Sequence, residues 1–287
     1  MEADMKKSWT WTTTGYGLAD KSHDEIMETC RFAGLAGIEG SPPLFEGNSE
    51  SELQAIGDRY RSAGLCIETF HLPFSPEDDI ASFYETVRRR AVDKMRLWMG
   101  RASLIGATVG IQHPTTNRSD ADVEGLETYF IQIGKSLETL LREAEGLNFT
   151  IALENMLPSG GGRFTSRPEH FERIVRDFAH PNLGFCLDTG HALVAARDDA
   201  HRFFDVMGSR MVAFHLADNA GDRDSHLAPG HGRVNWRRFF RHAAHIGYSR
   251  TMCIETQPFD FGPDYTDCAW KRMVADTEAL AESALKD

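Results

Sequence analysis

Short apolar segments alternate with longer segments of helical periodicity along the whole chain. Runs of four or five residues that are apolar on both faces are typical of buried parallel strands, and their alternation with helices predicts repeated βα units. Eight such runs occur, at 9–13, 35–39, 66–70, 108–112, 150–154, 183–187, 211–215 and 252–255. The pattern therefore predicts an α/β protein with eight parallel strands.

Between these runs, apolar residues recur at steps of three or four, which places them on one face of a helix. The clearest examples are 83–105 and 126–144, and later helices are predicted at 235–247 and at about 265–285. Eight strands, eight helices and a length near the roughly 250 residues typical of the fold predict one (β/α)₈ TIM barrel domain over 1–287. An open doubly wound sheet is disfavoured, because no G-x-G-x-x-G follows the first strand.

The composition is that of a folded globular protein. The chain has 287 residues, of which 41% are hydrophobic and 26% charged, which is enough to build a large core. Its 31 basic and 43 acidic residues give a net charge of −12, which repels polyanions. Nucleic acid is therefore a disfavoured partner.

The chain shows no sign of export or of membrane insertion. Its five cysteines are odd in number and form no C-x-x-C pair, which is typical of a reducing compartment. No apolar stretch of signal-peptide length opens the sequence, and no uncharged run is long enough to span a bilayer. We expect a soluble, cytoplasmic protein, and association with further copies of itself stays open.

Polar residues able to bind a metal follow six of the eight predicted strands. In a barrel the carboxyl ends of all strands meet on one face, where active sites are built. Carboxylates and imidazoles that converge there are costly to desolvate unless a cation compensates them. The pattern therefore predicts a divalent metal. The residues at these strand ends are His71, His113, Glu154, Asp188 with His191, His215 and Glu255.

The types of residue indicate which metal is bound. Glu154, Asp188 and Glu255 supply hard oxygen ligands and His215 supplies one nitrogen, a mixed set suited to Mn²⁺, Co²⁺ or Mg²⁺, and Zn²⁺ also fits. No cysteine is placed to contribute. His191 lies three residues after Asp188 and is either a further ligand or a group that hydrogen-bonds the substrate.

The loop after the seventh strand is dense in polar residues. Asp224 and His226 are two positions apart, so both can point inward from an extended segment and act as extra ligands. We interpret Asp218, Asn219 and Asp222 instead as residues that cap turns.

Six short segments carry a resemblance to a known family. They are Phe70-His-Leu-Pro-Phe74, Ala152-Leu-Glu-Asn155, Cys186-Leu-Asp-Thr-Gly-His191, Phe214-His-Leu-Ala-Asp-Asn219, Asp224-Ser-His-Leu-Ala-Pro-Gly-His-Gly232 and Ile254-Glu-Thr256. In this order and spacing they resemble the xylose-isomerase-like barrel superfamily, which contains sugar phosphate isomerases and epimerases and type IV apurinic endonucleases. The resemblance covers nearly the whole chain.

The resemblance to the ketose epimerases implies a mechanism. One divalent metal is held there by a Glu, an Asp, a His and a Glu, which match Glu154, Asp188, His215 and Glu255. The two glutamates exchange protons with opposite faces of a carbon next to a carbonyl, through an enediolate. We therefore expect an isomerase or epimerase of carbohydrate metabolism that acts on a small carbohydrate or polyol ketone. Residues expected to bind the substrate are His71, His113, His191, Arg223 and His226.

Two alternatives stay open. Inosose dehydratases and other keto-sugar lyases share the first step and then expel a leaving group, which His113 or His226 would assist. The endonuclease branch holds three zinc ions with nine ligands, and this chain has a match for each, but its acidity and its lack of a basic stretch disfavour DNA. The matching residues are His71, His113, Glu154, Asp188, His191, His215, Asp224, His226 and Glu255.

The sequence disfavours a phosphorylated substrate, because few basic side chains are placed to bind a phosphate. The loop after the last strand offers neither a glycine-rich nest nor a basic residue, and Arg223 and Arg233 are the remaining candidates. We therefore expect an unphosphorylated sugar, polyol or glycoside-derived ketone.

Overall fold

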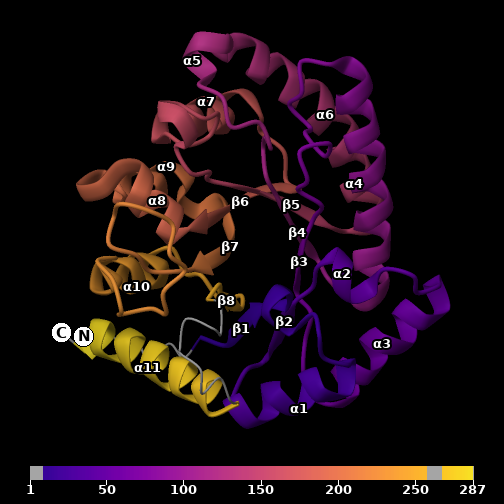
Figure 1. Cartoon of the computed structure of the whole chain (residues 1–287), viewed down its shortest axis with the longest axis vertical. Coiled ribbons are helices and arrows are strands. Elements are labelled where there is room, and N and C mark those ends of the chain that lie inside the picture. The colour runs from indigo at the N-terminus through magenta and orange to yellow at the C-terminus, as the bar shows by residue number, and fades with distance from the viewer. Residues whose placement is uncertain (1–8, 257–266, 287) are drawn as a thin grey trace.

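The computed structural model describes residues 9–256 and 267–286 and shows a (β/α)₈ TIM barrel (Figure 1). The strands lie at the centre and the helices surround them, as the sequence pattern predicts. The eight strands are β1 Trp11–Thr14, β2 Gly37–Glu39, β3 Thr69–His71, β4 Val109–Gln112, β5 Thr150–Glu154, β6 Leu183–Asp188, β7 Met211–Leu216 and β8 Met252–Ile254.

All neighbouring strands pair in parallel, in the order β2-β1-β8-β7-β6-β5-β4-β3. Single bridges between Gly37 and Cys66 and between Gly40 and Phe70 close the remaining gap between β2 and β3. Only glycine fits at position 37, because its φ is +153° and an added Cβ would lie 1.8 Å from the Cys66 carbonyl oxygen. This close approach brings the start of β2 into the barrel wall.

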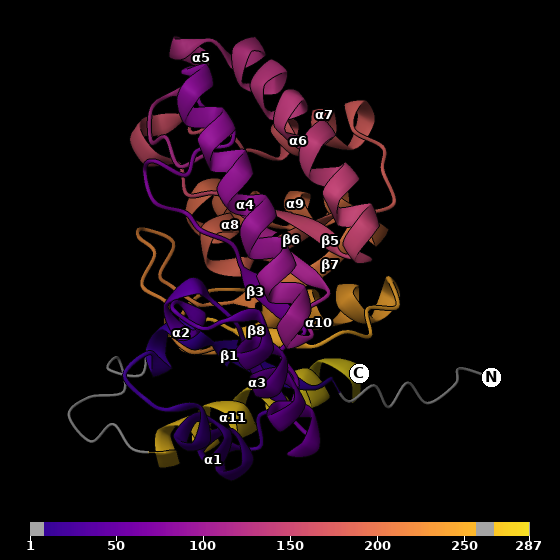
Figure 2. The ribbon, with the colours of Figure 1, turned by 90° about the vertical axis from the view of Figure 1, so that its right-hand side faces the viewer.

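One outer helix follows each strand along the chain. They are α1 His23–Ala33, α3 Glu50–Ser62, α4 Glu85–Ile105, α6 Leu126–Leu147, α7 Pro168–Asp177, α9 His201–Met207, α10 Trp236–His245 and α11 Asp267–Lys286. In both views α4 and α6 lie side by side on the outside of the strands (Figure 2). None of the helices in the described part of the chain combines the length and hydropathy needed to cross a bilayer.

The loops contain further short helices that the sequence pattern does not predict. They are η1 Gly15–Leu18, α2 Pro42–Phe45, α5 Ala121–Glu124, η2 Ser159–Gly161, α8 Thr189–Ala196, η3 Arg197–Asp199 and η4 Gly208–Arg210. The most important is α8, which begins directly after β6. The side chain of Asp188 caps it by accepting the His191 N–H at 2.6 Å. This cap places His191 in the first turn of α8, directly after the end of β6.

A small apolar cluster inside the barrel explains why the strand-end residues converge. It contains Val109, Ile111, Ala152, Cys186 and Ala213, all buried. Side chains two positions apart in a strand share a face, so the residue two positions after each of the last four also faces the barrel interior. Those residues are His113, Glu154, Asp188 and His215. The apolar cluster therefore forms the floor on which the polar site is built.

Candidate metal centre

Four residues from four neighbouring strands form one buried cluster. Glu154 ends β5, Asp188 ends β6, His215 lies in β7 and Glu255 follows β8, and one ligand atom of each lies within 4.8 Å of the others. His215 Nδ1 is 3.1 Å from Glu154 Oε1 and 2.9 Å from Glu255 Oε2. The structure thus brings together the four residues that the sequence predicts as metal ligands.

The donor set fits a divalent cation. Glu154 Oε2, Asp188 Oδ2 and Glu255 Oε2 are buried and accept no hydrogen bond from the described residues, and the nearest cationic groups to the two glutamate oxygens are histidines of the site itself. Uncompensated buried carboxylate oxygens are costly. Neighbouring ligands about 2.1 Å from an octahedral ion are about 3 Å apart. The distances of 3.1 Å and 2.9 Å from His215 Nδ1 to Glu154 Oε1 and Glu255 Oε2 are close to that spacing. Three carboxylates and one imidazole can therefore hold the metal.

Asn155 fixes the relative position of two of these ligands. Its side-chain oxygen accepts the Asp188 N–H at 2.8 Å, and its amide nitrogen donates to the Asp188 carbonyl at 2.9 Å. Because Asn155 directly follows Glu154, this double hydrogen bond sets the end of β6 against the end of β5.

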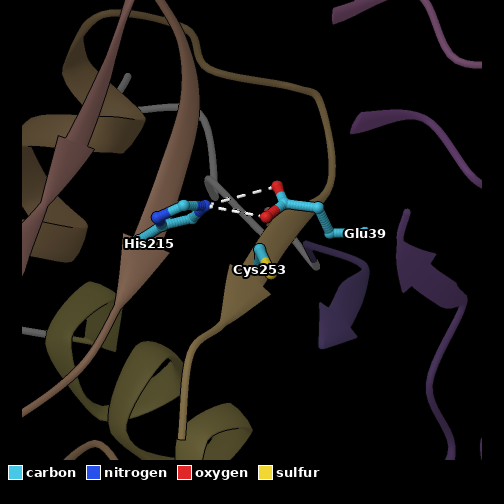
Figure 3. Close-up of side chains that lie close together, drawn as sticks. All are labelled: Glu39, His215 and Cys253. Atoms are coloured by element: carbon cyan, nitrogen blue, oxygen red, sulfur yellow. Dashed lines mark hydrogen bonds and ion pairs between the residues drawn. The ribbon is translucent and has the colours of Figure 1, made fainter. Parts of the chain in front are cut away.

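Glu39, at the end of β2, is a site residue that the sequence reasoning missed. Its Oε1 and Oε2 lie 3.1 Å and 3.3 Å from His215 Nε2 (Figure 3), and Oε2 also accepts the Thr69 hydroxyl at 2.8 Å. With the Nε2–H donated to Glu39, Nδ1 is left to face the cluster, the usual arrangement of a metal-binding histidine. Seven strand ends, rather than the six expected from the sequence, therefore contribute a side chain to the site. Glu39 could have been found, because it ends a predicted strand just as Glu154 does.

Cys253 lies beside Glu39 and His215 in the same part of the barrel (Figure 3). Burial raises the pKa of its thiol well above the ordinary value, so it stays protonated at neutral pH. Since the thiolate is the form that binds metals, we interpret the contact between Glu39 and His215 as one that orients the imidazole.

Replacing Glu39 with glutamine is expected to weaken metal binding about 10- to 100-fold, because the imidazole loses its anionic partner. Titration calorimetry of the metal-free protein with Mn²⁺ measures the affinity for the metal. Glu68→Gln is the matched control, since Glu68 bonds Arg250 and Thr251 rather than a site residue. Equal metal affinity in Glu39→Gln and the wild type would exclude the orienting role.

A second cluster shares Glu154 with the first. His71, His113 and Glu154 each offer a ligand atom within 4.8 Å of the others. Glu154 Oε2 is 3.1 Å from His113 Nε2 and 3.8 Å from His71 Nε2. His71 Nδ1 is 2.9 Å from the Leu72 carbonyl and donates to it, which leaves Nε2 to face the carboxylate. Both histidines stay predicted substrate-binding residues, and the geometry also suits a second ion.

A third group gathers around Asp224 in the loop after β7. Asp224 Oδ2 is 2.7 Å from His226 Nε2 and 3.4 Å from His191 Nε2, while Oδ1 is buried without a partner among the described residues. The Nδ1 atoms of the two histidines donate to the Asn155 carbonyl at 2.8 Å and the Glu255 carbonyl at 3.1 Å. Asp224 and His226 therefore lie together beside the metal centre, but the segment is not extended at His226, as the spacing argument assumed, because its φ is positive.

The backbone at His226 is strained. Its φ is +45°, a value that residues other than glycine rarely adopt. Such strain persists only where the surroundings impose it, and it is frequent at functional sites. Here it turns the His226 ring toward Asp224 and the Glu255 carbonyl.

The remaining polar residues of this loop do not belong to the three clusters. Asn219 accepts the Gly221 N–H at 2.8 Å and so caps a turn as predicted. Asp218 instead accepts N–H bonds from Gly230 at 3.0 Å and Val234 at 3.0 Å, which ties the two ends of the loop together. Arg223 is exposed, and no hydrogen bond or ion pair joins its side chain to the clusters in the described chain. Its role in substrate binding stays a prediction.

Burial and the mutual charges of the cluster residues shift their pKa values. Burial opposes a charged imidazole at His215, but neighbouring acidic groups, including Glu255 and Glu39, raise its pKa well above the ordinary value. Burial, reinforced by the charges of Glu255 and Asp224, raises the pKa of Asp188 to about 8. Without a metal, protons therefore supply part of the missing positive charge.

Metal binding is expected to release protons at neutral pH. Since the pKa of Asp188 is raised to about 8 without metal, its carboxyl is mostly protonated at pH 7 and must ionise to bind a cation. Apparent metal affinity should then rise with pH up to about 8 and fall as the pH is lowered. Calorimetric titrations with Mn²⁺ in two buffers of different ionisation enthalpy count the protons. Identical heats in both buffers would contradict the expectation.

Sequence relatives of this chain have few assigned activities. An uncharacterized protein of Methanocaldococcus jannaschii is 30% identical over 209 residues, which cover 71% of this chain and 68% of the relative. A protein of Solibacter usitatus described as probable endonuclease 4 is 27% identical over 229 residues, which cover 72% of this chain and 74% of the relative.

Solved structures confirm the fold. A D-tagatose 3-epimerase-like protein superposes with a TM-score of 0.78 at 23% identity, over 96% of this chain and 98% of the other. The D-psicose 3-epimerase of Clostridium cellulolyticum H10 superposes with a TM-score of 0.79 at 14% identity, over 97% of this chain and 100% of the other. The family model described as xylose isomerase-like TIM barrel matches residues 27–282. With its eight-stranded barrel and the buried acidic and histidine clusters at its carboxyl face, this chain belongs to the xylose isomerase-like TIM barrel family.

Proposed function

We propose that the protein is a divalent-metal-dependent isomerase or epimerase that acts next to the carbonyl of a small carbohydrate or polyol ketone. The observation that carries this proposal is the cluster in which two glutamates, one aspartate and one histidine present ligand atoms within 4.8 Å of one another. When bound, Mn²⁺, Co²⁺ or Mg²⁺ would stabilise negative charge on the substrate oxygens. Proton transfer is then left to the chain's own carboxylates.

Glu154 and Glu255 are suited to this transfer because they come from β5 and from the end of β8, on either side of His215. Burial favours the protonated carboxyl at both positions. Without metal, the positive charge of a protonated His215 outweighs burial, so the pKa of Glu154 lies well below its usual range and that of Glu255 falls to about 2. A bound divalent ion, which requires the neutral imidazole, would supply positive charge in its place. Both are therefore bases at neutral pH. One would remove the proton from the carbon next to the carbonyl, and the other would return a proton to the opposite face.

An aromatic side chain beside the cluster supports a sugar substrate. Phe74 is 41% exposed, and its ring centroid is 4.7 Å from that of His71 and 4.9 Å from that of His113. A half-exposed ring at the edge of a polar site can stack on the apolar face of a sugar. Several structural neighbours are described as sugar epimerases, including those for D-psicose and L-ribulose.

Solvent exchange tests the proposal even while the product is unidentified. The Mn²⁺-loaded protein is incubated in D₂O with ketoses, inososes and 3-keto-glycosides, and the substrates are followed by NMR. We expect deuterium to enter the carbon next to the carbonyl of at least one compound. A new epimer or isomer identifies the reaction, whereas loss of water identifies the dehydratase alternative. Failure of every carbonyl compound to exchange would refute proton abstraction by this site.

A second candidate, hydrolysis of phosphodiesters at abasic sites by three zinc ions, is favoured by one specific observation. The nine residues that match the endonuclease ligands lie in three groups around Glu154, His215 and Asp224. The relative described as probable endonuclease 4 adds support. The net charge of −12 opposes DNA binding, which is why we rank this function second. Cleavage of an abasic-site duplex by the zinc-loaded protein would reverse the order.

A further inference from the structure

Arg163 is a buried cation close to the metal centre. It lies in the loop after β5 and is only 6% exposed. Its Nη2 donates to the Thr115 carbonyl at 2.8 Å, and its Nε is buried without a hydrogen-bond partner. Among the described residues, no carboxylate lies within ion-pair distance of the guanidinium. A buried arginine with one hydrogen bond and no direct counter-ion is an expensive arrangement.

One hydrogen bond ties this guanidinium to the loop that follows β4 and carries His113. Thr115, which it bonds, lies two residues after His113 in the loop following β4. On its other side, the segment that carries Arg163 is tied to the end of β5, because the Thr165 carbonyl accepts the Met156 N–H at 3.0 Å, two residues after Glu154. Arg163 therefore lies where the loops that follow His113 and Glu154 meet.

The protein contacts do not account for a guanidinium at this position. The bond to Thr115 ties two loops together, and the Thr115 hydroxyl in turn donates to Asp79 at 3.0 Å. A single bond to a carbonyl needs only one donor, whereas arginine carries five in a planar fork that matches the two oxygens of a carboxylate or phosphate. The donors that the protein leaves unused are suited to an oxyanion.

We propose that Arg163 binds an oxyanion on the substrate, either a carboxylate or a phosphate, while the rest of the substrate occupies the metal centre. This inference rests on the proposed function and narrows its substrate class to acidic sugars or sugar phosphates. It replaces the expectation of an uncharged substrate, which was drawn from the loop after the last strand. Arg163 ends a glycine-rich stretch after β5, where the sequence alone does not show a buried charge.

Substrate selectivity tests the proposal. Arg163→Gln and Arg163→Lys are compared with wild type on matched neutral, phosphorylated and uronate forms of one ketose, such as D-tagatose, D-tagatose 6-phosphate and D-tagaturonate. Loss of a charge-assisted contact should raise KM for the preferred acidic form about 10- to 100-fold in Arg163→Gln. Lysine should restore part of the loss, and turnover of the neutral sugar should change little. The preferred form identifies the oxyanion.

Arg210→Gln is the matched control. Arg210 is also partly buried and donates to backbone carbonyls, those of Phe178 at 2.9 Å and Leu183 at 3.2 Å, but it directly precedes β7 and so lies at the opposite end of the strands from the metal centre. This variant should keep the selectivity of the wild type. If Arg163→Gln lowers turnover of neutral and acidic sugars equally and also lowers Tm, Arg163 only ties the two loops together and the proposal is wrong.

Binding of simple anions separates this proposal from the proposed function. The Mn²⁺-loaded proteins are titrated with inorganic phosphate and with acetate by calorimetry. If no ketose is turned over but the affinity for one of these anions is about tenfold lower in Arg163→Gln, the oxyanion site stands and the isomerase proposal fails. Unchanged affinity for both anions, together with unchanged selectivity wherever turnover is seen, overturns the role of Arg163.

Discussion

Replacement of Glu154 or Glu255 by glutamine is expected to reduce turnover by at least about 10²- to 10⁴-fold, the contribution of a positioned general base. Glutamine keeps the shape and one carbonyl oxygen for the metal, but it cannot accept the proton. Glu154 is buried and Glu255 partly buried within the same cluster, and their lowered pKa values keep both ionised at neutral pH, so either substitution removes a carboxylate that can accept the proton. The measurement is kcat on the substrate identified by solvent exchange.

The two variants should also differ from each other. If one glutamate acts on each face of the carbon, each variant retains hydrogen exchange from at most one of the two epimers and interconverts neither. The surface variant Glu282→Gln, which alters only an exposed pair with Lys286, controls for nonspecific effects. Metal content of each protein must be measured in parallel. Full turnover in either variant with metal bound would show that the assigned base is wrong.

Replacement of Asp188 by asparagine is expected to remove the metal while preserving the fold. Asp188 Oδ1 caps α8 through the His191 N–H, a role that asparagine performs equally well, whereas Oδ2 faces the cluster without a partner. The substitution therefore exchanges one metal ligand for an amide. Plasma mass spectrometry of the protein as purified should find about one ion per wild-type chain and far less in the variant.

Thermal unfolding provides an independent measurement of the same loss. A metal present at about a thousand times its Kd stabilises a protein by about 4 kcal/mol, so added metal should raise the Tm of wild type and leave that of Asp188→Asn unchanged. Two to three zinc ions in the wild type would instead favour phosphodiester cleavage. Full metal content in the variant would contradict the assignment of Asp188 as a ligand.

The alternation of apolar runs and helical periods was sufficient to predict the barrel. Its eight strands lie within a few residues of the predicted runs, because strands buried on both faces have few polar positions that could mislead. The short helices in the loops were not predicted. A helix such as α8 depends on the cap that Asp188 provides and on packing against neighbouring loops, rather than on a long periodic pattern.

In the site, too, some residues could be predicted from the sequence and others could not. Glu154, Asp188, His215 and Glu255 could be identified because each ends or follows a strand, and the ends of parallel strands meet on one face of a barrel. Glu39 has the same sequence signal, but its function depends on reaching His215 from β2 across the barrel, a distance that no spacing along the chain encodes.

Strand periodicity decides which side chains share a face, so the linear order of residues was enough to specify the barrel and the ring of metal-binding residues at its carboxyl face. The folded chain was needed to show which of these residues touch, how they divide into three groups, and that Arg163 is buried with no carboxylate of the described residues at ion-pair distance. Contacts between distant loops and desolvation of a charge arise from packing in three dimensions. A local pattern of residue types contains neither.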